Sequence, residues 1–214
     1  MRGFTKLALG CRTRGAAAID LDKFVPPDSR LAREAEEACA EQSPGIAAHS
    51  YRAWLFGQAL SQLDGRPLDP ELFYCASLIH DWGIGSITPG QDFTIRGAER
   101  AIRCAGDAGL PHAAAMTLAD AITFAANLSM DPATDGIGAY VAAGAMVDGG
   151  LRLWDISRPN VDRVLAQHPR GKGFKRELAG LIRAEAKAVP GGRFSLYSRC
   201  GMPLLILAAP LPAS

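Results

Sequence analysis

Apolar side chains recur along most of the chain at the spacing of an α-helix. After the turn at residues 26–29, the apolar positions Leu31, Ala35, Ala38 and Cys39 fall at i, i+4, i+7 and i+8, which places them on one helical face. No segment shows the recurrent alternation of apolar and polar residues that is typical of strands. The pattern therefore predicts an all-α protein, folded as a helical bundle.

Capping residues, prolines and glycines indicate where these helices begin and end. Ser43–Pro44 and Asp69–Pro70 each combine a capping side chain with a proline at the first helical position. The expected helices cover about residues 29–42, 43–64, 69–81, 95–108, 112–128 and 134–149, and two more start near Pro159 and Gly171. Residues 82–92 are rich in glycine and proline and are expected to form a loop. The segment after residue 190 is expected to be irregular, with residues 193–197 extended.

Length and composition fit one globular domain. The chain has 214 residues, of which 48% are hydrophobic and 21% charged, and its formal net charge is +1. A chain of this size can build one substantial core. We expect residues 26–190 to form the helical domain, residues 1–25 an N-terminal extension and residues 191–214 a C-terminal tail. The nearly neutral charge argues against nucleic acid or an anionic membrane as a partner.

Cysteine usage favours a cytoplasmic protein. The five cysteines are far apart, with no CxxC pair, and are therefore expected to be reduced thiols: Cys11, Cys39, Cys75, Cys104 and Cys200. The apolar stretch before the first of them is too short for a secretory signal. The apolar run at residues 202–212 is short and interrupted by prolines, so it is not expected to span a bilayer.

Two histidines and two aspartates lie in apolar helical surroundings. His80 and Asp81 end an apolar helix, and an antiparallel pairing of helices would bring His49 opposite His80. Asp148 ends another apolar helix, where a carboxylate needs a partner unless it faces solvent. Imidazole and carboxylate groups together suit Zn, Fe, Mn or Ni. An HD dipeptide alone is weak evidence, so its context decides.

The order of these residues resembles the HD-domain superfamily of metal-dependent phosphohydrolases, whose signature is H…HD…D on successive helices. The likeness is nearer to the cyanamide-hydratase-like branch. It extends in order over about residues 26–176 and includes His49-Ser50-Tyr51-Arg52, Leu78-Ile79-His80-Asp81, Gly144-Ala145 with Asp148, and Pro169-Arg170 with Phe174-Lys175. The resemblance implies an HD-type bundle in which His49, His80, Asp81 and Asp148 hold one divalent metal ion.

The sequence departs from that branch at one place. Its members tend to carry a histidine near the positions held here by Phe124 and Ala125. The absence of this histidine argues against nitrile hydration but leaves the four implied ligands intact. A dinuclear oxygenase would need two further histidines between Asp81 and Asp148, whereas only His112 lies there, and it is expected to face solvent.

We therefore predict a metal-dependent hydrolase that uses a metal-activated water on a small-molecule substrate, with a phosphomonoester as the leading choice. Two alternatives stay open: a lyase that hydrates cyanamide or a nitrile, and a non-catalytic metal-binding module. Zn or Fe is the favoured metal, and Mn or Ni is also compatible.

Further candidates surround these residues. Arg52, one helical turn after His49, is expected either to position an anionic substrate or to pair with a ligand carboxylate. Trp82 could wall the site or anchor its loop. Thr123 and Asn127 could line a substrate pocket, although packing at the edge of the core explains them as well.

Two surface features complete the predictions. The basic cluster formed by Arg170, Lys172, Lys175 and Arg176 could attract a phosphate, although solvated charge is the simpler interpretation. The apolar tail at residues 203–211 has too many prolines for a helix and too many large aliphatic side chains for a free end. It should lie across the bundle or bury against a second copy, and a homodimer is the slightly favoured version.

Overall fold

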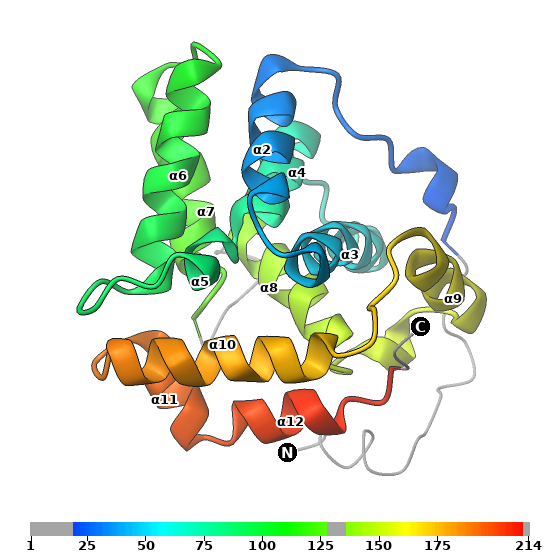
Figure 1. Ribbon diagram of the computed structural model, residues 1–214. Coiled ribbons are helices and arrows are strands. Elements are labelled where there is room, and N and C mark those ends of the chain that lie inside the picture. The colour runs from blue at the N-terminus through cyan, green and yellow to red at the C-terminus, as the bar shows by residue number, and fades with distance from the viewer. Residues whose placement is uncertain (1–18, 128–135, 212–214) are drawn as a thin grey trace.

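The computed structural model describes residues 19–127 and 136–211, and the fold is all-α, as predicted. Within these residues no β-strand forms, and an isolated bridge joins Thr88 to Gln91. The helices form a bundle with α10 across one end (Figure 1). Their bounds are η1 Leu21–Lys23, α2 Arg30–Ala40, α3 Pro44–Leu63, α4 Pro70–Ile79, α5 Trp82–Gly85, α6 Phe93–Asp107, α7 His112–Phe124, α8 Gly136–Asp148, η2 Leu153–Asp155, α9 Arg158–Gln167, α10 Phe174–Ala188, α11 Arg193–Arg199 and α12 Met202–Ala208.

Side-chain caps confirm three of the predicted helix starts, and a fourth cap, at Asp92, lies in the segment that was expected to be a loop. The hydroxyl of Ser29 accepts a hydrogen bond from the backbone amide of Ala32, and Ser43 caps α3 in the same way. The carboxylate of Asp69 caps α4, and Asp92 caps α6. Such side chains satisfy amides of the first turn that have no partner within the helix. The capping residues Ser43 and Asp69 therefore fix where α3 and α4 begin, and these two helices carry His49, His80 and Asp81.

The helices α3 and α8 pack at close range because glycines face the contact. A Cβ atom on Gly144 would overlap the carbonyl oxygen of Ala53, and one on Gly57 would overlap the carbonyl oxygen of Tyr140. These glycines let the two backbones approach more closely than ordinary side chains allow. The contact fixes His49, on α3, relative to Asp148, on α8.

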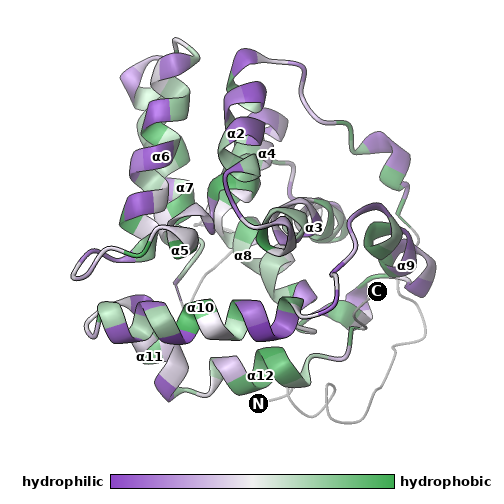
Figure 2. Cartoon of the chain, in the orientation of Figure 1, coloured by the Kyte–Doolittle hydropathy of each residue, from purple (hydrophilic) through white to green (hydrophobic). Residues whose placement is uncertain are grey.

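Buried apolar side chains form two clusters. The larger one takes its members from α2, α3, α4, α6, α7, α8 and α9. The smaller one joins Ile46, Ile84 and Phe93 to the inner faces of α10, α11 and α12. Helices α6 and α10 accordingly show one polar and one apolar face (Figure 2). The final helices therefore belong to the packed body of the protein.

The segment that follows the HD pair is more ordered than the sequence predicts. The expected loop at residues 82–92 begins with the short helix α5. Arg96, which is buried, donates two hydrogen bonds to the carbonyl oxygen of Gly83 and one, at 2.6 Å, to Glu185 of α10. This ion pair lies between α6 and α10 and holds the turn after Asp81 in place. The sequence did not reveal this ion pair, because Arg96 and Glu185 are 89 residues apart in the chain.

The prediction of an irregular C-terminal tail is wrong. Residues 193–199 form α11 rather than an extended segment, and residues 202–208 form α12. Pro203 lies in the first turn of α12, where its missing amide hydrogen would have no helical acceptor in any case. Pro210 follows the end of the helix, so neither proline interrupts it.

The described part of the N-terminal extension is also tied to the body. Ile19 and Leu21 are buried, and Asn160 of α9 donates a hydrogen bond to the carbonyl oxygen of Ile19. Residues 1–18, including Cys11, lie outside the described residues, as does the predicted helix start at Thr134. The helix predicted to run to Leu128 ends earlier, because α7 stops at Phe124 and residues 125–126 form a turn. No helix in the described residues has both the length and the apolar content needed to cross a bilayer.

Candidate metal centre

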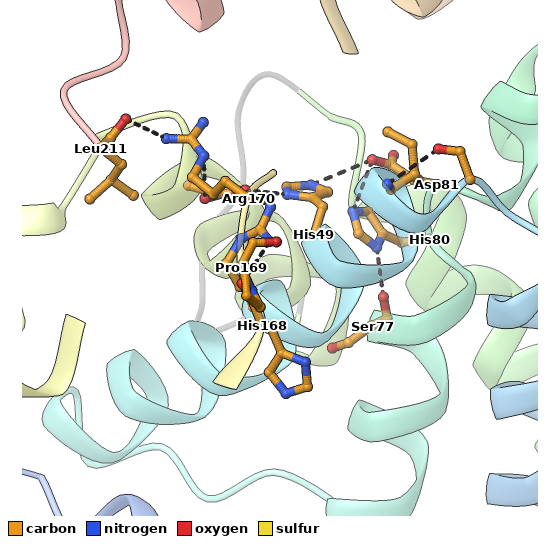
Figure 3. Close-up of polar contacts among 12 residues, drawn as sticks. His49, Ser77, His80, Asp81, His168, Pro169, Arg170 and Leu211 are labelled. Atoms are coloured by element: carbon orange, nitrogen blue, oxygen red, sulfur yellow. Dashed lines mark hydrogen bonds and ion pairs between the residues drawn. The ribbon is translucent and has the colours of Figure 1, made fainter. Parts of the chain in front are cut away.

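His49, His80 and Asp81 form a buried cluster that could hold a metal ion. His49 comes from the second turn of α3, whereas His80 and Asp81 follow the last turn of α4. His49, His80 and Asp81 are 4%, 6% and 8% exposed, respectively. The two imidazole rings have centroids 5.5 Å apart, and both rings lie beside Asp81 (Figure 3). The predicted approach of His49 to His80 is therefore present. The two helices cross steeply rather than lying antiparallel as expected, with α3 seen end-on in Figure 1 and α4 upright.

The ligand atoms of the cluster have the separations that one ion requires. Asp81 Oδ2 lies 3.5 Å from His49 Nε2 and 3.4 Å from His80 Nε2. Two atoms that each lie about 2.1 Å from a tetrahedral ion are about 3.4 Å apart. All three ligand atoms fall within 4.8 Å of one another. The chain therefore brings them together at a spacing suited to a first-row divalent metal.

Hydrogen bonds direct the lone pair of each imidazole toward the centre of the cluster. His80 Nδ1 lies 2.7 Å from the carbonyl oxygen of Ser77, which can only accept, so Nδ1 carries the proton. His49 Nδ1 lies 2.8 Å from Asp148 Oδ2 and donates to it in the same way. In neutral rings both Nε2 atoms are then unprotonated. A carbonyl or carboxylate partner of this kind is the usual companion of a metal-binding histidine.

His80 Nε2 has no hydrogen-bond partner although it is buried. A buried polar atom without a partner is unfavourable, and a metal ion would satisfy it. Burial lowers the pKa of His80, and the neighbouring His49 lowers it further, against the opposing effect of Asp81. The neutral form that binds metals is thereby favoured. The residues present fit a divalent ion.

Asp148 lies on the other edge of the His49 ring. It is 1% exposed, and its Oδ2 accepts hydrogen bonds from His49 Nδ1 and Arg52 Nη2, each at 2.8 Å. Arg170 Nε lies 3.5 Å from Oδ1. Burial alone would raise the pKa of Asp148, but the hydrogen bonds from His49 and Arg52 and the charge of Arg52 outweigh it and hold that pKa well below its usual range.

This position separates Asp148 from the cluster of three. Nδ1 and Nε2 lie on different edges of an imidazole ring, so a carboxylate bonded to one is not beside an ion bound to the other. In the structure Asp148 orients His49, and direct ligation would require its carboxylate or the His49 ring to turn. The implied role of Asp148 as a fourth ligand stays a prediction.

Arg52 is fully buried and directs its guanidinium to protein groups. Besides the bond to Asp148, its Nη1 donates to the carbonyl oxygens of His168 and Pro169 at 3.0 and 3.2 Å. The guanidinium carbon also lies 4.9 Å from the centroid of the Phe174 ring. Of the two predicted roles, these contacts favour bracing a carboxylate over positioning a substrate.

The other predicted site residues lie farther from the cluster or face elsewhere. Trp82 donates a hydrogen bond to Glu41 at 2.8 Å and lies beneath the guanidinium of Arg103, so it anchors its segment to α2 and α6. Thr123 bonds to the carbonyl oxygen of Asp120 on its own helix. Asn127, beyond the end of α7, is exposed, as is His112 on the same helix.

Three residues that support the site were missed at the sequence level. The carbonyl of Ser77 orients His80, the ring of Phe174 packs 5.7 Å from that of His49, and Arg170 pairs with Asp148. Phe174 and Arg170 both lie in the segment near residues 169–175 that resembles the HD-domain superfamily, and this was the signal that could have found them. Arg170 was interpreted as solvated charge. It is instead 2% exposed.

Comparison of the chain with protein-family models and with curated proteins gives no match. What the site does must therefore be inferred from its own residues and their geometry.

Proposed function

We propose that the protein is a metal-dependent hydrolase of the HD type that acts on a small phosphomonoester. The observation that carries the proposal is the buried cluster of His49, His80 and Asp81, in which two imidazole lone pairs and a carboxylate converge. The order of these residues along the chain, together with Asp148, resembles the HD signature and supports the same assignment.

Three protein ligands are the arrangement typical of catalytic rather than structural metal sites. A divalent ion held there would polarise a substrate oxygen and lower the pKa of a bound water. The chain itself keeps the ligands in register: Ser77 orients His80, and Asp148 orients His49. Arg52 then holds Asp148 in place. Burial of the ligand residues excludes bulk water, which strengthens electrostatic effects within the site.

A metal-content measurement tests the first half of the proposal. Purified protein, or protein reconstituted with Zn²⁺ or Fe²⁺, is expected to hold about one ion per chain. Replacing His80 or Asp81 by alanine should abolish this binding, whereas replacing the exposed His112 by alanine should not. Asp148→Asn should weaken metal affinity by about 10–100-fold if Asp148 only orients His49.

Activity tests the second half. The metal-loaded protein should hydrolyse members of a phosphomonoester panel, and Asp81→Asn should remove that activity together with the metal. Absence of bound metal after reconstitution would refute the metal centre. A loaded protein that leaves the phosphomonoesters intact but hydrates cyanamide would refute hydrolysis in favour of the lyase alternative. A loaded protein inactive on both would indicate a non-catalytic metal-binding module.

A further inference from the structure

A cavity of about 350 Å³ lies between the start of α10 and helix α12. Among the described residues that line this cavity, three are basic and none is acidic. The cavity is lined by Arg170, Gly171, Gly173, Phe174, Lys175, Arg176 and Leu207. None of the candidate metal ligands lines the cavity. Phe174, which does line it, also packs against the ring of His49. The cavity therefore adjoins the candidate metal centre.

The charged side chains that line this cavity are all cationic. The guanidinium carbons of Arg52 and Arg170 lie 4.9 and 5.1 Å from the centroid of the Phe174 ring. Asp148 is the carboxylate whose charge acts on both Arg170 and Lys175, and it is shared with Arg52 and His49. Burial lowers the pKa of Lys175, the charge of Arg170 lowers it further, and Asp148 does not compensate for both. An incoming anion would relieve this repulsion.

Two of the cations are bonded to neutral groups of the C-terminal segment. Lys175 Nζ donates to the carbonyl oxygen of Ala209 at 2.5 Å. Arg170 Nη1 donates to the carbonyl oxygen of Leu211 at 3.0 Å, as Figure 3 shows. A backbone carbonyl carries only a partial negative charge, so a phosphate oxygen would be a stronger acceptor for the same donors. The start of α10 beside the cavity also has no side-chain cap on its first amides.

We propose that this cavity binds a phosphate-type oxyanion, held mainly by Arg170, Lys175 and Arg176. The site is formed by the chain alone and does not require the metal ion. The anion is either free phosphate or the phosphoryl group of a small molecule, since both present the same oxygens. This interpretation replaces the view of the basic cluster as solvated charge for Arg170, Lys175 and Arg176, although Arg176 is also exposed to solvent; Lys172 is exposed and does not line the cavity.

Calorimetric titration of the metal-loaded, full-length protein with inorganic phosphate tests the site, with chloride at equal ionic strength as the blank. We expect saturable binding that weakens about tenfold in both Lys175→Gln and Arg176→Gln. Lys172→Gln removes the same charge three residues from Lys175 and should change the affinity less than about twofold. Glycerol phosphate as a second probe separates the two sources, because only a site for phosphoryl groups should bind it in competition with inorganic phosphate.

Three outcomes would overturn the proposal. Heats equal to those of chloride would show that phosphate only screens charge. Equal weakening by Lys172→Gln would show a diffuse electrostatic effect rather than a built site. Loss of binding on chelation of the metal, in protein that circular dichroism shows to be folded, would place the phosphate on the metal instead. If the chelated protein unfolds, the Lys175 and Arg176 variants in the loaded protein decide, because neither residue belongs to the metal cluster.

Discussion

At the scale of single residues, the most constrained group of the molecule is the carboxylate of Asp148. It is buried, accepts hydrogen bonds from His49 and Arg52, and lies in ion-pair range of Arg170. Removing one partner of a buried ion pair leaves a charge without compensation, which is more damaging than the pair itself is stabilising. The same carboxylate orients a candidate metal ligand, so stability and metal affinity should change together when its partners are altered.

Replacement of Arg52 by alanine measures this coupling. We expect the free energy of unfolding to fall by about 3–5 kcal/mol, because Asp148 would lose the nearer of its two buried cationic partners, Arg52 at 2.8 Å against Arg170 at 3.5 Å. Metal affinity should fall about 10–100-fold, because His49 would no longer be held in one orientation. Chemical denaturation and competition with a chelator give the two quantities.

Arg163→Ala provides the matched control, since it removes an arginine from an exposed ion pair with Asp22 and should change neither measurement. A contrary result would be an Arg52→Ala protein with normal stability and metal content whose phosphomonoester turnover is reduced about a hundredfold. That outcome would assign Arg52 to the substrate.

At the scale of elements, the geometry of the site depends on how closely α3 and α8 pack. Gly144 lies against the backbone of α3 with no room for a Cβ atom. Gly144→Ala should therefore push the helices apart and lower the free energy of unfolding by about 1–3 kcal/mol. Urea denaturation measures this, and metal affinity should fall with it because Asp148 ends the displaced helix.

Gly180→Ala is the corresponding control within a helix. Gly180 is an exposed residue of α10, and a Cβ atom there would meet no other atom within 4 Å. This substitution should stabilise the protein by about 0.5–1 kcal/mol, because alanine has the higher helix propensity. If both glycine variants shift stability in the same direction, the close approach of α3 and α8 is not what Gly144 provides.

At the scale of the whole molecule, the last two helices leave an apolar surface. Leu196 of α11 and Leu204, Leu205 and Leu207 of α12 are 48%, 67%, 42% and 38% exposed. Helix α12 is correspondingly apolar over much of its length (Figure 2). The tail nevertheless packs on its own chain through Ile206 and Leu211, so a dimer formed by the tail would have to use the outer leucines.

We expect light scattering to give a mass of twice the 22.6 kDa of one chain. Leu204→Glu should reduce this to a single chain, because a charge would be buried in the contact. Met116→Glu, a similar change at a 38% exposed apolar residue of α7, should leave the mass unchanged. A wild-type protein that is monomeric at all concentrations would show that the leucine surface has no second copy as its partner.

Local sequence signals predicted much of the fold. The helical periodicity, the capping residues Ser29, Ser43 and Asp69, and the prolines after the last two placed the first helices close to where they are. These features act through neighbours within one turn, so they can be recognised along the chain. The approach of His49 to His80 was also predicted, because consecutive elements of a chain tend to be neighbours in space. The antiparallel pairing on which that prediction relied is not what brings them together, because α3 and α4 cross steeply (Figure 1).

Tertiary structure alone decided the environment of these residues. Arg170 and Phe174 reach the site from more than a hundred residues after His49, and the carbonyls of Ala209 and Leu211 come from the other end of the chain. Whether Arg52 faces a substrate or a carboxylate depends on where α8 crosses α3, which no local pattern encodes. The sequence by itself determined an all-α fold and the approach of His49 to His80 and Asp81. The packing of distant segments determined which of their nitrogens are free, which carboxylate orients them and where positive charge collects beside them, because those properties depend on contacts between residues far apart in the chain.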